Sequence, residues 1–290
     1  MCYALLGKSG LYAFDFEGNE LWHVDVGQLS DPARWGDGTS PIVVDDLIIV
    51  DAGVLGHRFV GFDKKTGKEI WSLQNADFTN GWATPTIVEV NGKEEVLFNV
   101  PKRLYALDPT SGRQLWSAES PLDDAACGSV VTSGDVAFIM GSRAGHALAV
   151  RCGGIGDVTA TNTVWNKRLQ AGICTPLIVG ENIYWCTNGI FFAASTSTGE
   201  YLYKERLPRL GGATGGFPNA DYSSPIALDD RIVQFTRNGE SYVIEAGDKF
   251  TLIAHNPAFD GDSTSFSATP AASDKELFVR SEGYLYCVGE

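Results

Sequence analysis

The fold is decided by the stretch Asp108-Pro109-Thr110-Ser111-Gly112-Arg113-Gln114-Leu115-Trp116, because a near copy precedes it in the chain. That copy is Asp63-Lys64-Lys65-Thr66-Gly67-Lys68-Glu69-Ile70-Trp71, with the same Asp, Gly-centred turn and Trp. Upstream of each stands a dipeptide such as Thr84-Pro85 that opens an apolar run. Six such openings, 44 to 49 residues apart, occur along the chain: Ser40-Pro41, Thr84-Pro85, Gly128-Ser129, Thr175-Pro176, Ser224-Pro225 and Thr269-Pro270. A fixed period of this length is typical of a radial or solenoid array of repeats.

One repeat, residues 83–120, reads as four short strands. Apolar, β-branched runs predict strands at 86–90, 96–100, 104–108 and 114–117. Asn91-Gly92 is a typical tight hairpin turn, because both residues tolerate a positive φ. Four antiparallel strands in a repeat of this length predict an all-β fold, a β-propeller of four-stranded blades.

The repeats predict one domain over residues 1–290, most simply with seven blades of which two are incomplete. Five complete blades are expected, at 40–75, 83–119, 128–169, 174–207 and 223–257. The terminal segments, 2–26 and 268–288, supply three strands each. In the alternative arrangement, a strand of the N-terminal segment completes the C-terminal blade, which gives six blades.

Composition excludes several classes of function. The chain has 290 residues, 44 % of them hydrophobic, and a formal net charge of −14. This charge disfavours a nucleic-acid partner, since phosphate binding needs clustered Lys and Arg. No apolar run reaches the roughly 18 residues of a membrane-spanning helix, so no transmembrane segment is expected.

The repeats resemble those of the pyrroloquinoline quinone (PQQ)-like β-propeller family, and most closely its BamB-like members. The resemblance rests on the two stretches that end at Trp71 and Trp116, on Ala83-Thr84-Pro85 and on Tyr284-Leu285-Tyr286-Cys287-Val288-Gly289. It implies that each of these Trp residues docks on the next blade and has a structural role. Such proteins usually have eight blades and an export signal, so the chain is expected to be the C-terminal part of one, exported to a bacterial periplasm.

The PQQ cofactor itself is not expected. In the family that the chain resembles, the true quinoprotein dehydrogenases hold an adjacent Cys-Cys pair over the quinone. The six cysteines of this chain stand at 2, 127, 152, 174, 186 and 287, so none are neighbours. A quinoprotein oxidoreductase is therefore only the third choice of function.

Carboxylates and amides recur in the loops that join successive blades, nearest the expected central channel. These residues are Asp37, Asp77, Asn80, Asp124, Asp221 and Asp262. Converging carboxylates repel one another unless protons or a cation neutralise them, and hard oxygen ligands suit Ca²⁺. The alternative is that Asp is common in loops because it caps turns. The two interpretations stay open at this point.

The same face is expected to carry aromatic and basic side chains around the acidic centre. Ligand-binding candidates are Trp35, Trp82, Arg58, Arg143, Arg237 and Tyr222, and the neighbouring turns and loops add Asn188, Phe78 and Phe266. Aromatic residues with polar neighbours make good interaction anchors. The aromatic residues can equally wedge between blades, and polar turns are common on any surface.

Two functions of different classes follow. The first is a non-enzymatic binding or scaffold module that presents this face to a protein, a peptide or a small polar ligand. The alternative is a Ca²⁺-dependent hydrolase of lactones or esters, in which the ion polarises the carbonyl and activates water. His57 or His146 would then act as the general base, because an unperturbed histidine titrates near pH 6.5.

Overall fold

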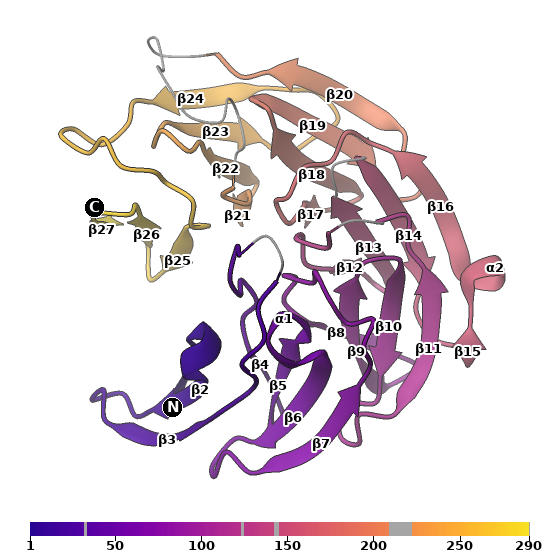
Figure 1. Ribbon diagram of the computed structural model, residues 1–290. Coiled ribbons are helices and arrows are strands. Elements are labelled where there is room, and N and C mark those ends of the chain that lie inside the picture. Colours follow the sequence, from indigo (N-terminus) through magenta and orange to yellow (C-terminus); the bar gives the residue numbers. More distant parts are fainter. Residues whose placement is uncertain (32–33, 123–124, 142–144, 209–221, 290) are drawn as a thin grey trace. The chain divides into compact units, whose positions relative to one another are not determined.

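The computed structural model (Figure 1) describes residues 1–290 except 32–33, 123–124, 142–144, 209–221 and 290. The described residues form seven small sheets, in which neighbouring strands follow one another along the chain, except that a later strand joins the third sheet. The chain divides into two compact units, Met1–Ser142 with Ala147–Asn166, and Arg143–His146 with Lys167–Glu290. The expectation of a single domain over 1–290 stays a prediction.

The first three sheets lie in the first unit, and the fourth is shared between the units. The first sheet has β1 (Cys2–Leu5), β2 (Leu11–Phe14) and β3 (Glu20–Val24). The second has β4 (Ile42–Val44), β5 (Leu47–Ala52), β6 (Arg58–Asp63) and β7 (Glu69–Gln74). The third has β8 (Thr86–Val90), β9 (Lys93–Val100), β10 (Arg103–Leu107), β11 (Gln114–Glu119) and β15 (Gly156–Asp157). The fourth has β12 (Val131–Ser133), β13 (Val136–Gly141), β14 (His146–Arg151) and β16 (Thr163–Arg168).

The last three sheets lie in the second unit. The fifth has β17 (Leu177–Val179), β18 (Asn182–Thr187), β19 (Ile190–Ser195) and β20 (Tyr201–Arg206). The sixth has β21 (Ile226–Leu228), β22 (Arg231–Phe235), β23 (Ser241–Glu245) and β24 (Leu252–Asn256). The seventh has β25 (Ala271–Ser273), β26 (Glu276–Arg280) and β27 (Leu285–Val288). The helices are short: η1 (Gly7–Ser9), α1 (Gly53–Gly56) and α2 (Thr159–Asn162). These sheets match the seven predicted blades, whereas the six-blade alternative is wrong, because β3 pairs with β2 in a sheet of its own.

The core lies between consecutive sheets. In the first unit, Phe59 of the second sheet stacks on Phe98 of the third, with ring centroids 3.9 Å apart. In the second unit, Tyr184 of the fifth sheet and Ile232 of the sixth belong to one buried cluster. Alternate residues along each strand thus face the neighbouring sheet, as in a propeller blade.

Trp71 docks on the next sheet, as predicted, and Trp22 of the first sheet does the same. The Nε1 of Trp71 donates a hydrogen bond to the Pro109 carbonyl oxygen at 2.8 Å. The Nε1 of Trp22 donates to the Lys64 carbonyl oxygen at 3.3 Å. Each acceptor lies in the turn between the last two long strands of the following sheet, so the tryptophan joins two blades.

Trp116 packs in one buried cluster with Ile139 and Leu148 of the next sheet, as predicted, but its hydrogen bond departs from this pattern. Its Nε1 donates at 2.6 Å to Glu95 Oε2 of its own sheet, in place of the next one. The reason is the longer β14–β16 connection, which sends β15 back to pair parallel with β11, Gly156 opposite Trp116. The segment that contains Gly156 and Asp157 thus adds a strand to the preceding sheet, which the four-strand repeat did not predict.

The Ser and Thr residues that open the repeats form a relay of hydrogen bonds within each unit. In the first unit, Ser40 N donates to Thr84 Oγ1 at 3.1 Å, and Thr84 N donates to Ser129 Oγ at 3.0 Å. In the second, Ser224 Oγ accepts from Thr175 N at 3.0 Å, and Ser224 N donates to Thr269 Oγ1 at 3.0 Å. A hydroxyl at this position therefore links the innermost strands of successive sheets.

Candidate functional site

Two predicted ligand-binding residues, Trp35 and Trp82, lie together in the first unit. Their ring centroids are 5.2 Å apart, with planes inclined at 47°. Trp82 is fixed at both ends, because its Nε1 donates to the Gly36 carbonyl oxygen and its backbone N to the Ala126 carbonyl oxygen, each at 2.8 Å. Trp35 is 57 % exposed. The pair presents an exposed aromatic ring on a fixed base, which is the property of an interface anchor.

Two carboxylates lie near this pair. Asp51, the penultimate residue of β5, is 1 % exposed, and its Oδ1 accepts a hydrogen bond from Gly53 N at 2.8 Å. Its Oδ2 has no hydrogen-bond partner among the described residues. Burial raises the pKa of Asp51 to about 8, and the Asp37 charge adds to the rise. Burial likewise raises the pKa of Asp37 to about 6, against backbone hydrogen bonds from Thr39 and Gly38. The pair is therefore a site that holds a proton near neutral pH.

Sequence reasoning found Asp37 and missed Asp51. The signal was present, since Asp51 is a lone acid within the apolar run Ile48-Ile49-Val50-Asp51-Ala52. A carboxylate at a buried strand position is expensive, and such residues are often functional.

The six predicted metal ligands do not gather into a site in the described part of the chain. There, no group of three or more His, Cys, Asp or Glu residues is placed to hold a metal ion. Asp124 and Asp221 lie outside the described residues. Asp77 is exposed, and Asn80 has a left-handed φ of 53°. The Ca²⁺ site stays an untested prediction.

Asp262 shows the turn-capping role that was the alternative to metal binding. Its Oδ1 accepts from the backbone N of Thr264 at 2.9 Å and from its Oγ1 at 2.6 Å. Its Oδ2 accepts from the Tyr286 hydroxyl at 2.8 Å. Hydrogen bonds, first that of Ser281 and then that of Thr264, lower the pKa of Asp262. This carboxylate ties its loop to the seventh sheet.

The two proposed general bases lie in different units. His57 follows α1 with a left-handed φ of 52°, and its backbone N donates to the Gly53 carbonyl oxygen at 3.0 Å. His146 begins β14. Neither imidazole has a hydrogen bond to a carboxylate within the described ranges, so a catalytic role for either stays a prediction.

The predicted basic residues have different surroundings. Arg58 is held in place, because its guanidinium pairs with Glu69 at 2.8 Å and reaches the Val26 carbonyl oxygen at 3.4 Å. Arg237 lies 5.0 Å from the ring centre of Tyr222, which is 42 % exposed, so these two candidates do meet. Arg143 lies outside the described residues. The remaining aromatics, Phe78 and Phe266, are both 1 % exposed and wedge into the core.

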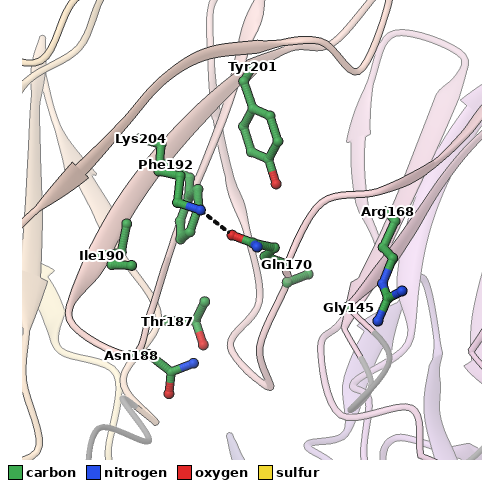
Figure 2. A pocket seen from close by; sticks show the side chains of 10 residues that line it. Gly145, Arg168, Gln170, Thr187, Asn188, Ile190, Phe192, Tyr201 and Lys204 are labelled. Atoms are coloured by element: carbon green, nitrogen blue, oxygen red, sulfur yellow. Dashed lines mark hydrogen bonds between the residues drawn. The ribbon is translucent and has the colours of Figure 1, made fainter.

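A pocket of about 720 Å³ lies in the second unit (Figure 2). One wall comes from the end of β16 and the loop after it, with Arg168, Gln170 and Ala171. The facing wall comes from the fifth sheet and its β18–β19 turn: Thr187, Asn188, Ile190, Phe192, Tyr201 and Lys204. Of these, sequence reasoning had singled out only Asn188.

Lys204 is the central polar group of this pocket. Its ammonium donates to Gln170 Oε1 at 2.5 Å and lies 5.5 Å from the centre of the Phe192 ring. Phe192 stacks in turn on Trp185, with centroids 5.1 Å apart. Lys204 and Phe192 are partners on adjacent strands. That cross-strand pairing was the missed signal, because it puts a cation and an aromatic ring on one face of the sheet.

The comparisons with known proteins agree with this architecture. The chain resembles the crystal structure of BamB from Moraxella catarrhalis with a TM-score of 0.72 and 16 % identity, over 98 % of this chain and 80 % of that one. The computationally designed Ika8 protein matches with a TM-score of 0.55 and 12 % identity, over 97 % and 90 % of the two chains. These matches show the fold, a seven-bladed β-propeller, as predicted.

A model of the family described as outer membrane protein assembly factor BamB matches residues 2–205. The chain belongs to this family, as its PQQ-like repeats predicted. A quinohemoprotein alcohol dehydrogenase from Pseudomonas putida HK5 also matches, with a TM-score of 0.59 and 13 % identity, over 89 % of this chain and 52 % of the enzyme. That likeness shows a shared fold and no shared activity. No curated protein sequence matches the chain.

Proposed function

We propose that the protein is a non-enzymatic binding module that holds a polypeptide partner during outer-membrane protein assembly in a bacterial periplasm. The family name supplies the process. The structural observation that supports binding is the exposed ring of Trp35, seated on the fixed ring of Trp82 at 5.2 Å. An aromatic side chain held in place loses little conformational freedom when a partner covers it.

The negative charge of the chain favours a partner with a basic surface. The chain carries a formal net charge of −14, and Asp37 is next to Gly38, on which an ideal Cβ would lie 3.6 Å from Trp82 Cδ1. A partner segment with an apolar side chain flanked by Lys or Arg would meet both the tryptophans and this acidic surrounding.

No helix among the described residues has the length and apolar character to cross a membrane.

A lactone or ester hydrolase is not advanced as a second function. No observation in the described residues favours it over binding, since the candidate bases and carboxylates form no shared hydrogen-bonded site. The same holds for quinone-dependent oxidation.

The test uses a photo-crosslinking amino acid in place of Trp35 in the source bacterium. The control position is Ile155, which is 93 % exposed in the same unit. We expect a discrete adduct with a component of outer-membrane assembly from position 35 and none from position 155. Deletion of the gene should also lower the amounts of outer-membrane β-barrel proteins, and Trp35→Ala should fail to restore them. Normal amounts in the deletion strain, or full restoration by Trp35→Ala, would refute the proposal.

A further inference from the structure

The pocket beside Lys204 is preformed by close backbone approach. Leu169 N donates to the Gly145 carbonyl oxygen at 2.8 Å, which fixes the loop after β16. An ideal Cβ on Gly145 would lie 3.0 Å from Gln170 Cα, and one on Gly172 would lie 2.6 Å from Thr187 Oγ1. Only glycine at these two positions lets the loop come this near the sheet. The walls therefore need no rearrangement to accept a ligand.

Strained backbone marks both walls. Gln170 has a φ of 49° and Asn188 a φ of 54°, both in the left-handed region. Asparagine tolerates this region, whereas glutamine rarely adopts it. Strain of this kind persists where the surrounding structure imposes it, and it concentrates at ligand sites. From this backbone conformation, the Gln170 side chain extends across the pocket to Lys204 (Figure 2).

The polar groups that face the pocket can all donate a hydrogen bond. Lysine can only donate, so the hydrogen bond from Lys204 fixes the amide of Gln170 with its oxygen toward the ammonium and its NH₂ group elsewhere. Within the described ranges this NH₂ group has no acceptor, and the side chains of Thr187 and Asn188 make no hydrogen bond. The ammonium keeps two further N–H groups. These donors lack an acceptor that a ligand would supply.

The charged side chains that line the pocket are basic. Arg168 and Lys204 line the pocket, and no Asp or Glu is among the lining residues that the structure describes. This contrasts with a chain whose formal net charge is −14. Figure 2 shows Arg168 apart from Lys204 and Gln170, so the donors around Gln170 include one ammonium and three neutral groups. This set suits a monoanion such as a carboxylate better than a phosphate dianion.

An aromatic surface adjoins these donors. Tyr201 is 40 % exposed, and its ring lies 5.9 Å from that of Phe192. Burial raises the pKa of Tyr201, so its hydroxyl stays protonated and remains a donor. Figure 2 shows this hydroxyl pointing into the pocket. A ring attached to the anion can lie against Tyr201.

We propose that this pocket binds a carboxylate carried next to an aromatic ring, with the carboxylate at Lys204 and Gln170 and the ring against Tyr201. The site uses none of the residues around Trp35. It holds whether or not the proposed assembly function does.

The test compares benzoate with benzamide, its neutral analogue of the same shape, by NMR titration of the purified protein. We expect saturable benzoate binding in the millimolar range that a ligand of this size allows, about tenfold tighter than benzamide. Lys204→Met keeps the alkyl stem and should remove the preference for benzoate. Lys249→Met removes an exposed lysine of the adjoining β23–β24 connection and should leave it unchanged.

A second variant guards against misfolding. Gln170→Gly relieves the left-handed backbone while removing the amide, so it should fold normally and bind benzoate about tenfold more weakly. The dipeptide N-acetyl-Asp-Phe-amide separates the two sources of such a carboxylate. Tighter binding than benzoate assigns the site to a polypeptide, and weaker binding assigns it to a small aromatic acid. Equal binding of benzoate and benzamide, or unchanged benzoate affinity in Lys204→Met, would overturn the proposal.

Discussion

The indole of Trp71 occupies the space that a side chain on Gly112 would need. An ideal Cβ on Gly112 would lie 2.3 Å from Trp71 Cε3, and the indole Nε1 donates to Pro109 in the same turn at 2.8 Å. Gly112 also has a left-handed φ of 67°. The Trp of one repeat and the Gly of the next therefore form a single joint between two sheets, which explains why both recur together in the repeat.

Gly112→Ala should destabilise the protein by about 2–4 kcal/mol, because the methyl group adds steric conflict with Trp71 to the cost of a left-handed backbone. Urea unfolding gives the free-energy change. The matched control is Gly92→Ala, which has a φ of 75° but nothing within 4 Å of its Cβ. It should lose only about 1 kcal/mol. Equal losses in the two variants would show that the indole does not press on Gly112.

Trp71→Ala should cost about 3–5 kcal/mol, as removal of a large buried side chain does. In the double variant with Gly112→Ala the two losses should not add, because without the indole the new methyl group has space. Additive losses in a double-mutant cycle would contradict a shared joint.

Removal of one hydroxyl from the relay should lower the free energy of unfolding by less than Trp71→Ala does. Ser224 Oγ accepts from Thr175 N at 3.0 Å, so Ser224→Ala leaves a backbone donor without its acceptor. We expect a loss of about 1–2 kcal/mol in urea unfolding. The control is Ser273→Ala, at an exposed position of β25, which should change stability by less than about 0.5 kcal/mol. A loss no larger than that of the control would remove the relay as a stabilising element.

The fold could be predicted from the sequence because its signals are local and repeated. Thr84-Pro85, Asn91-Gly92 and the Asp108–Trp116 stretch each specify one strand start or turn, and the period specifies the rest. The sequence did not predict the irregular connection between β14 and β16. Residues 152–162 return to pair with β11 through Gly156 and Asp157, and no local pattern encodes a partner in another repeat.

The candidate site was less predictable, because part of it stands in strands, where the fold decides which residues become neighbours. Trp35 and Trp82 come from loop sequences, and they do meet. Asp51 and Lys204 stand in strands, and their significance depends on which neighbour the sheet places beside them. Asp51 approaches Asp37 from a different part of the chain, and Lys204 approaches Gln170 across the space between two sheets. Such pairings exist only after folding.

Asp51 predicts a pH dependence of stability. Its pKa rises to about 8 in the folded protein, against about 3.9 in the unfolded chain. Between these values the folded state binds the extra proton, so stability falls as pH increases from about 4 to 8. Asp51→Asn cannot ionise. Its stability relative to the wild type should therefore grow with pH, to a few kcal/mol at pH 8 in urea unfolding.

Asp108→Asn is a control whose stability relative to the wild type should change with pH in the opposite direction. Hydrogen bonding by Thr110 lowers the pKa of Asp108, so its contribution is present above the unfolded-state pKa and is lost as pH falls below it. This variant should be less stable than the wild type at pH 7 and should approach it near pH 3. The same pH trend in both variants would contradict the assignment of the Asp51 proton.

A proton on Asp51, in place of Ca²⁺, is expected to relieve the repulsion between Asp37 and Asp51. Asp37 and Asp51 both hold protons more tightly than usual. In the second unit, Asp262 already accepts hydrogen bonds from Thr264 and Tyr286. A resident cation site would raise stability by about 2.7 kcal/mol at a hundredfold excess over Kd. We expect no such rise: the melting temperature at pH 7.5 should be the same with Ca²⁺ and with chelator, while a shift to pH 5.5 should increase it. A Ca²⁺-dependent increase that Asp37→Asn abolishes and Asp77→Asn preserves would instead establish a cation site at Asp37.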